Sequence, residues 1–228
     1  MAFIKVYELY CIVEKTGGKN DAKRTHGTSS DEMIGKKILR KEALKSRRAI
    51  SRKRNDELSS EVKSRLFKTP EFSRAKVIAS YVAKSDEVHT RGIILAALEQ
   101  GKRVIIPRAD RTVRRLHFYE IHSLSGLTEG NFGVPEPPAR GRAIPLSESQ
   151  VVLVPVVAWD KDGNRLGYGK GYFDRELRSR GASLAIGLAF ESQRAAKLPR
   201  YNTDIPLDAI VTEERVLRVK QSRRSKPV

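Results

Sequence analysis

The stretch VVLVPVVAWDKDGNRLGYGKGYFDR, residues 151–175, decides the fold because it runs from a buried strand through a turn into a helix. Its first seven residues are apolar and rich in valine, which predicts a strand buried on both faces of a parallel sheet. Residues 162–164, Asp-Gly-Asn, form a turn of the kind that permits positive φ. A helix is then predicted over residues 172–180, ended by Gly181.

Glycine alternates with tyrosine and lysine in GYGKG, residues 167–171, between this turn and the helix. A backbone without side chains can bring consecutive N–H groups onto an anion, and a helix N-terminus adds a partial positive charge. Arg165 and Lys170 would add full charges beside that anion. Asp174 offers a carboxylate that could hold Mg²⁺ between phosphate groups. The residues therefore indicate a phosphate cradle.

The glycine pattern has a second interpretation. It matches neither GxxxxGK[ST] nor the spacing of the dinucleotide-binding fingerprint. An alternating-glycine turn is more often a tight connection or a β-bulge than a nucleotide site. The flanking Arg, Lys and Asp bring the two interpretations to equal weight, so the residues alone leave both open.

A basic helix is predicted near the N-terminus. The sequence Ser-Ser-Asp-Glu at residues 29–32 has the form of a capping box. Apolar residues then recur at helical spacing, at Ile34, Ile38, Leu39, Ala43 and Leu44. Lys36 and Arg40 lie four residues apart and share one face. On the residues alone, a basic face in contact with solvent is favoured over a ligand contact.

A β-α-β unit is predicted from a strand over residues 76–83, a helix over 89–100 and a strand over 103–107. This order implies parallel strands joined by a right-handed crossover. Glu87 follows the first strand, at the edge where ligands collect in open α/β sheets. It could equally cap the following helix, and that is the simpler interpretation of the residue alone.

The remaining elements are predicted more briefly. We expect a helix over residues 57–67, an irregular loop over 131–145 that covers a site, and strands over 116–120, 184–189 and 208–212.

The run DKDGNRLGYGKGYFDR, residues 160–175, resembles the signature of 5-formyltetrahydrofolate cyclo-ligases, also called 5,10-methenyltetrahydrofolate synthetases. The resemblance extends from about Lys36 to Thr212. It implies a single-domain, three-layer α/β/α fold with a largely parallel sheet. It also implies an enzyme that uses ATP and Mg²⁺ to convert 5-formyltetrahydrofolate into 5,10-methenyltetrahydrofolate, with release of ADP and phosphate through a phosphorylated formyl (iminium phosphate) intermediate.

The resemblance also implies which residues bind ATP. The family has a Lys-x-x-x-Arg pair on its first helix that contacts ATP, and Lys36 and Arg40 match it. The rest of the implied ATP site is Arg165, Leu166, Gly167, Tyr168, Gly169, Lys170, Gly171, Tyr172 and Phe173. We take Lys170 and Arg165 as the catalytic candidates.

The folate and metal sites are implied in the same way. Val82 and Glu87 match positions that line the folate pocket, and a carboxylate there can accept hydrogen bonds from the N–H groups of a pterin ring. Tyr168, Gly169, Lys170, Gly171 and Tyr172 complete the expected folate site. Asp174 and Asp204 match the metal positions. Family members often have His before the second Asp, where this chain has Thr203.

Length and composition bound the domain organisation. The chain of 228 residues suits one domain, for which we expect the range 33–214, with a poorly ordered extension over 1–32 and a basic tail over 215–228. We hypothesise that Met33 is the native start. Cys11 is the only cysteine, so no intrachain disulfide can form, and a reducing cytoplasmic setting is expected.

The formal net charge of +18 suggests nucleic acid or a lipid surface as a partner. Residues 36–56 carry ten Lys or Arg against two acids, and residues 215–228 carry six against none. Because these two segments hold 14 of the 18 net charges, a solvated face is favoured. One alternative is a nucleic-acid-binding protein on the same scaffold, and a second is an enzyme that keeps the ATP site but acts on another formylated substrate. We expect no membrane partner, and a monomer.

Other chemistries find little support in the sequence. There are four histidines and no HExxH motif, which disfavours a zinc site. No GxSxG motif is present, which disfavours covalent hydrolase chemistry. Trp159 is predicted to lie in the core or in the wall of a pocket.

Overall fold

The computed structural model describes residues 29–219, with side chains described from residue 35 onward. Most of the expected N-terminal extension and the tail from residue 220 lie outside the described residues. The first helix, α2 (Ser29–Arg48), begins where the capping box predicts it. The capping side chains themselves are outside the described part of the chain.

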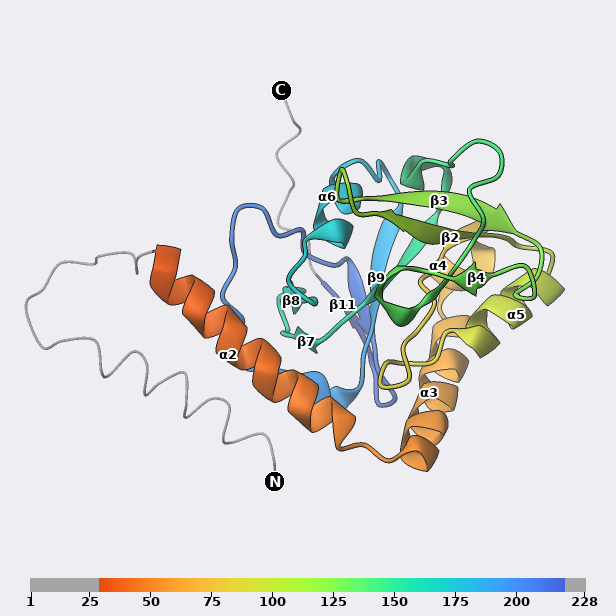
Figure 1. Ribbon diagram of the computed structural model, residues 1–228. Helices are drawn as coiled ribbons and strands as arrows, with labels where there is room; N and C mark the ends of the chain where they lie inside the picture. Colours follow the sequence, from red (N-terminus) through yellow and green to blue (C-terminus); the bar gives the residue numbers. More distant parts are fainter. Residues whose placement is uncertain (1–28, 220–228) are drawn as a thin grey trace, which may run out of the picture.

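The described chain opens with helices, and from β1 onward helices and 3-10 turns are interspersed among the strands (Figure 1). The helices after α2 are α3 (Arg52–Phe67), α4 (Pro70–Arg74), α5 (Arg91–Glu99) and α6 (Tyr172–Arg178), with 3-10 turns η1 (Asn131–Gly133), η2 (Leu146–Glu148) and η3 (Glu191–Gln193). The strands are β1 (Val77–Ala79), β2 (Arg103–Asp110), β3 (Arg115–Ile121), β4 (Thr128–Glu129), β5 (Pro135–Glu136), β6 (Val151–Pro155), β7 (Ala158–Trp159), β8 (Arg165–Leu166), β9 (Leu184–Leu188), β10 (Ala209–Val211) and β11 (Val216–Arg218).

The central sheet has seven strands in the order β11-β10-β9-β6-β1-β2-β3. The inner strands from β10 to β2 are parallel to their neighbours, and β3 and β11 at the edges are antiparallel. Two small ribbons, β4-β5 and β7-β8, lie outside this sheet. The predicted, largely parallel α/β sheet is confirmed.

Strand β6 shows why a valine-rich run belongs at the centre of such a sheet. Residues 151–154 are fully buried. Val151 and Leu153 pack into a cluster with side chains of α3, α4 and α5, whereas Val152 and Val154 pack into a second cluster that includes Leu177 of α6. Because successive side chains of a strand point to opposite faces, this one run joins the layers on both sides of the sheet.

Most predicted boundaries agree with the observed elements to within two residues, but β1 does not. Only residues 77–79 of the expected strand over 76–83 pair in the sheet. After Ser80, whose N–H still donates to the carbonyl of Ile105 (2.9 Å), the chain leaves the sheet. Tyr81 stays buried and donates to the carbonyl of Val88 (3.2 Å). An apolar run that lines a cleft has the same composition as a buried strand, which explains the error.

Three other differences have local causes. Helix α3 begins at Arg52 rather than at residue 57, because Ser51 caps it by accepting a hydrogen bond from the N–H of Arg54 (3.3 Å). Strand β2 runs beyond residue 107, since β3 pairs with its full length. The loop over residues 131–145 is not wholly irregular, because it contains η1 and β5.

The C-terminal end of the described chain also differs from the expected tail. Residues 216–218 form β11, which pairs with β10 at the edge of the sheet. Arg218 of this strand forms an ion pair with Glu71 of α4 (2.7 Å). The first residues of the segment expected to be a basic tail are therefore part of the fold.

No helix in the described part of the chain has the length and apolar character needed to cross a membrane. Trp159 is buried, as predicted, and its indole N–H donates to the carbonyl of Phe190 (3.2 Å).

We predict that Gly187→Ala destabilises the fold. A Cβ at Gly187 in β9 would lie 2.5 Å from Cδ1 of Leu207 and 3.0 Å from Cγ2 of Val156, and both of these side chains are buried. Overpacking of this kind lowers the free energy of unfolding by about 1–3 kcal/mol, measured by urea denaturation. Gly126→Ala is the control, because nothing lies within 4 Å of its Cβ position. Equal stability of the two variants would contradict this account of the core.

Candidate functional site

A cleft of about 1010 Å³ opens at the edge of the sheet where the parallel strands end. Its wall includes Val82, which follows β1, and Pro155, the last residue of β6. Ligands collect at this edge in open α/β folds. All the site residues predicted from the sequence line this cleft, namely Lys36, Arg40, Val82, Glu87, Asp174, Asp204 and residues 165–173. The structure thus brings them together, and the ligands assigned to them remain predictions.

The glycine turn, residues 167–171, owes its shape to two left-handed glycines and a nearby arginine. Gly169 and Gly171 have φ of 89° and 69°, which side chains rarely tolerate. A Cβ on Gly169 would lie 3.0 Å from Cζ of Arg40, whose Nε donates to the carbonyl of Gly167 (2.7 Å). Burial lowers the pKa of Arg40. Glycine is therefore required where the guanidinium of α2 packs on the turn.

The N–H groups of the same turn remain available. Within the described residues, the backbone N–H groups of 168–171 donate to no protein acceptor. The helix that follows, α6, has only seven residues. The partial positive charge at its N-terminus therefore contributes less to anion binding than these backbone donors and the side-chain cations. The geometry fits a bound anion.

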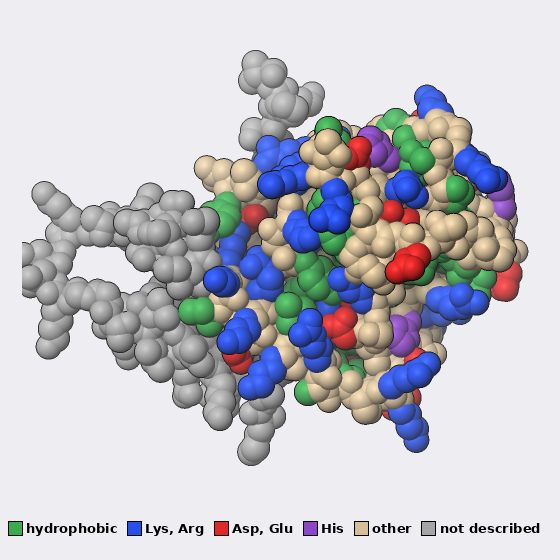
Figure 2. All heavy atoms as spheres, viewed as in Figure 1, with side chains coloured by type: hydrophobic (Ala, Val, Ile, Leu, Met, Phe, Trp, Pro, Cys, Tyr) green, Lys and Arg blue, Asp and Glu red, His purple; other side chains and the backbone are tan. Residues whose placement is uncertain are grey.

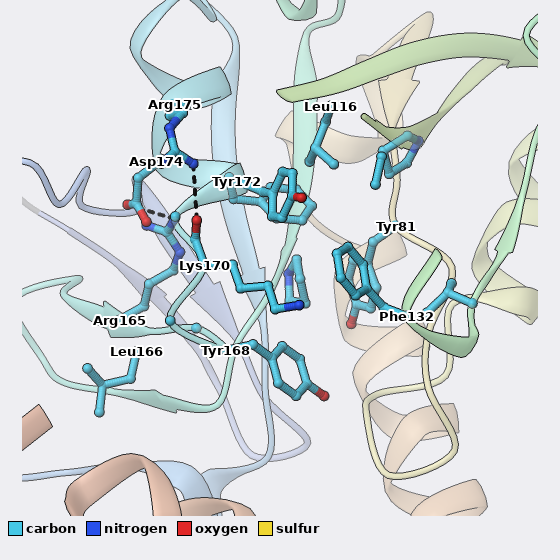
Figure 3. Close-up of a pocket in the computed structure, with 18 of the residues that line it drawn as sticks. Tyr81, Leu116, Phe132, Arg165, Leu166, Tyr168, Lys170, Tyr172, Asp174 and Arg175 are labelled. Carbon is cyan, nitrogen blue, oxygen red and sulfur yellow. Dashed lines mark hydrogen bonds and ion pairs between the residues drawn. The ribbon is translucent and has the colours of Figure 1, made fainter. Parts of the chain in front are cut away.

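Arg165 and Asp174 form a connected pair at one end of the turn (Figure 3). Nη2 of Arg165 donates to Oδ1 of Asp174 (2.9 Å), and Nη1 donates to the carbonyl of Ile205 (2.5 Å). The N–H of Ile205 also donates to Oδ1 of Asp174 (3.1 Å). The Arg165 side chain is only 4% exposed, and burial lowers its pKa. Arg165 thus orients the carboxylate of Asp174.

Lys36 and Asp204 form a second pair. Nζ of Lys36 donates to Oδ2 of Asp204 and lies 3.6 Å from the ring centroid of Tyr201. The N–H of Tyr201 donates to the same carboxylate oxygen (2.7 Å). Lys36 is nearly buried, so the first predicted cation of α2 faces inward rather than toward solvent.

The two aspartates fit a magnesium ion held mainly by other ligands. Among the described residues, Oδ2 of Asp174 and Oδ1 of Asp204 accept no hydrogen bond, and both side chains line the cleft. No cluster of three or more His, Cys, Asp or Glu is arranged to hold a metal in that part of the chain. Mg²⁺ is commonly held by one or two carboxylates together with water and substrate phosphates, which matches this donor set.

Glu87 lies across the cleft and does not cap the next helix. Its Oε1 accepts a hydrogen bond from the hydroxyl of Tyr168 (2.9 Å), and its Oε2 accepts from the N–H of Lys84 (2.8 Å). The N-cap of α5 is Thr90 instead. Burial and the nearby Glu87 carboxylate raise the pKa of Tyr168 well above its usual value, so its hydroxyl stays protonated near neutral pH.

The sequence model of the 5-formyltetrahydrofolate cyclo-ligase family matches residues 32–213. The chain belongs to this family. The resemblance carried by residues 160–175 is thereby confirmed, together with the membership of an enzyme family that it implies.

Cyclo-ligases from distant organisms align with most of the chain. The 5-formyltetrahydrofolate cyclo-ligase of Escherichia coli K12 is 32% identical over 174 residues, which cover 75% of this chain and 96% of the relative. That of Mus musculus is 29% identical over 190 residues, covering 78% and 94%. The NMR structure of Aquifex aeolicus 5,10-methenyltetrahydrofolate synthetase superposes with a TM-score of 0.73 at 35% identity, covering 84% and 96%.

The cyclo-ligase cleft contains residues that the sequence reasoning missed. Nζ of Lys170 lies 3.9 Å from the ring centroid of Phe132, and this ring packs edge-on against Tyr172 at 5.7 Å (Figure 3). Nζ of Lys84 lies 4.5 Å from the ring centroid of Tyr168. The 131–145 loop was expected to cover a site, but nothing in its composition singles out Phe132. Its left-handed backbone, with φ of 63°, is visible only in the structure.

We predict that Gly169→Ala is destabilising and Gly167→Ala is not. The first variant places a side chain at φ of 89° and against Arg40, whereas Gly167 has nothing within 4 Å of its Cβ position and no positive φ. Left-handed backbone costs an ordinary residue about 1–2 kcal/mol. Urea denaturation of both proteins without ligand measures the difference. Equal losses would show that the turn is not held in this conformation.

Proposed function

We propose that the protein converts 5-formyltetrahydrofolate into 5,10-methenyltetrahydrofolate with ATP and Mg²⁺, releasing ADP and phosphate. Membership of the cyclo-ligase family supports the overall reaction. One structural observation supports the use of a nucleotide: among the described residues, the N–H groups of residues 168–171 donate to no protein acceptor, and these residues line the same cleft as Asp174 and Asp204.

The ATP end of the cleft comprises Lys36, Arg40 and residues 165–173. Phosphoryl transfer depends mainly on positioning and on neutralising charge, with little covalent help from the protein. Free backbone donors, the guanidinium of Arg40 and the ammonium of Lys170 provide such an environment. Arg165 acts through Asp174, because its two terminal nitrogens already donate to protein oxygens. Mg²⁺ bound by Asp174 and Asp204 would neutralise phosphate charge.

The reaction itself needs an activated formyl group. Its oxygen is a poor leaving group, so it first attacks the γ-phosphorus of ATP and ADP departs with the bonding electrons. The resulting iminium phosphate is attacked at its formyl carbon by the neighbouring N10, which loses its proton. Phosphate then leaves with the C–O electrons, and the ring is closed. Lys170 is suited to stabilise the transferring phosphoryl group, because its ammonium faces the cleft (Figure 3).

The folate end of the cleft comprises Val82, Glu87 and residues 168–172. Glu87 is nearly buried, and each of its oxygens already accepts one hydrogen bond. A carboxylate oxygen can accept a further bond, so Glu87 can receive N–H donors of a pterin ring. The rings of Tyr168, Tyr172 and Phe132 supply flat apolar surface beside it.

We predict that Asp174→Asn largely abolishes formation of the methenyl product. Asparagine can keep a hydrogen bond to Arg165 but loses the charge that would hold the metal. Ala at this position would leave the buried guanidinium unpaired, so Asn is the cleaner test. The expected loss of turnover is about a hundredfold or more, followed by product absorbance.

Asp162→Ala is the matched control, because Asp162 is an exposed turn residue that does not line the cleft. It should retain full turnover. Unchanged turnover of Asp174→Asn at ordinary Mg²⁺ concentrations would contradict the metal assignment. If unsubstituted protein forms no product from ATP, Mg²⁺ and 5-formyltetrahydrofolate, the proposed function itself is wrong.

We predict that Arg165→Lys raises the ATP concentration needed for half-maximal turnover. Lysine cannot donate to both Asp174 and the carbonyl of Ile205 with the geometry of the guanidinium fork. Loss of such a supporting contact typically costs about 10–100-fold in affinity or activity. The KM for folate should stay close to that of the unsubstituted protein. A change confined to folate affinity would contradict the placement of Arg165.

A further inference from the structure

The basic residues of α2 and of the start of α3 form two groups, one exposed to solvent and one that faces inward. Within residues 36–56, the exposed cations are Lys37, Lys41, Lys45, Arg48, Arg52, Lys53 and Arg54, and Figure 2 shows Lys and Arg side chains gathered over this part of the molecule. Lys36, Arg40 and Arg47 face inward. Their spacing of four and seven residues places them on one face of the helix. Lys36 and Arg40 line the cleft, whereas Arg47 lies behind it.

Arg47 uses all its guanidinium nitrogens. Arg47 is only 1% exposed. Nε and Nη2 donate to Oδ2 of Asp86 at 3.2 and 2.8 Å, and Nη1 donates to the carbonyl of Val156 at 3.1 Å. Nη2 also donates to the hydroxyl oxygen of Tyr168 at 2.6 Å. One side chain therefore joins α2 to three other segments: the loop after β1, the residue that follows β6, and the glycine turn.

The bond to Tyr168 has a defined direction. Arg47 has no acceptor atom, so the tyrosine oxygen must be the acceptor in that contact. The single hydroxyl proton of Tyr168 is then directed to Oε1 of Glu87, 2.9 Å away. The raised pKa of Tyr168 is consistent with a proton that stays on the hydroxyl. The chain of donors runs one way, from Arg47 through Tyr168 to Glu87.

We propose that Arg47 is a positioning residue of the cyclo-ligase site. It fixes the hydroxyl and ring of Tyr168 and, through them, the orientation of the Glu87 carboxylate at the folate end of the cleft. Its role for folate rests on the proposed function. The carboxylate of Asp86 compensates the buried charge of Arg47. The side chain of Asp86 is itself only 20% exposed.

A ligand-free measurement tests the contact itself. The chain has seven tyrosines, and with ¹³Cζ-labelled tyrosine the NMR signal of Tyr168 is identified by its loss in Tyr168→Phe. We expect Arg47→Lys to shift the Tyr168 signal more than any other tyrosine signal. Arg180→Lys is the control, because Arg180 is also buried and ion-paired, to Asp208, but does not line the cleft. An unmoved Tyr168 signal in Arg47→Lys overturns the proposal.

A binding measurement tests the role. Titration calorimetry gives the affinity of each variant for 5-formyltetrahydrofolate without ATP. We expect Arg47→Lys to weaken binding about tenfold, the size typical for loss of a charge-assisted hydrogen bond. The same substitution made in Tyr168→Phe should weaken binding less than about twofold, because the contact is already absent. Arg180→Lys should bind folate as tightly as the unsubstituted protein.

Two results of this titration overturn the role. One is unchanged affinity in Arg47→Lys, and the other is an equal loss in both backgrounds, which would mark Arg47 as a structural support independent of Tyr168. Absence of folate binding by the unsubstituted protein would instead reject the proposed function. The NMR measurement still decides in that case whether Arg47 controls Tyr168.

Discussion

The glycine turn is held from one side by helix α2, and the geometry of the cleft depends on that contact. Arg40 donates to the carbonyl of Gly167 and packs where a side chain on Gly169 would lie. Arg47 donates to the hydroxyl of Tyr168. A turn rich in glycine has high conformational entropy when unfolded, so contacts of this kind are needed to keep it in one conformation.

Two ion pairs place charge beside the turn. Lys36 of α2 is paired with Asp204, and Arg165 is paired with Asp174. Each aspartate keeps one oxygen without a protein hydrogen bond among the described residues. These groups are therefore ordered before any ligand arrives, which would reduce the reorganisation needed for charge to move in the proposed phosphoryl transfer.

Local patterns in the sequence predicted much of this arrangement. A short valine-rich run is typical of a strand in a sheet covered on both faces, so residues 151–157 predicted β6. The alternating glycines indicated an anion site, and helical spacing placed Lys36 and Arg40 on one face. The resemblance added the substrates, the reaction, and the roles of Glu87 and Asp204, none of which follows from periodicity.

Contacts between distant segments could not be predicted in this way. Arg47 has the same helical phase as Arg40, but its partners are 39, 109 and 121 residues away along the chain. Arg47 lies in a segment rich in Lys and Arg, which by composition resembles a basic face in contact with solvent. Only the fold shows which of these cations face inward. Strand β1 was overpredicted for a related reason, because Tyr81 and its neighbours are buried by the cleft wall rather than by strand pairing.

The alternation in GYGKGY, residues 167–172, also explains how one segment serves both ends of the cleft. Lys170 and Tyr172 lie toward Phe132, whereas the hydroxyl of Tyr168 is directed to Glu87 (Figure 3). The glycines between them leave the backbone bare, and Arg40 occupies the space where a side chain on Gly169 would lie. Side chains can thus contact one reactant while backbone N–H groups contact the other. Because both sets of groups belong to consecutive residues, the covalent chain itself would hold the reacting oxygen and phosphorus of the proposed reaction close together.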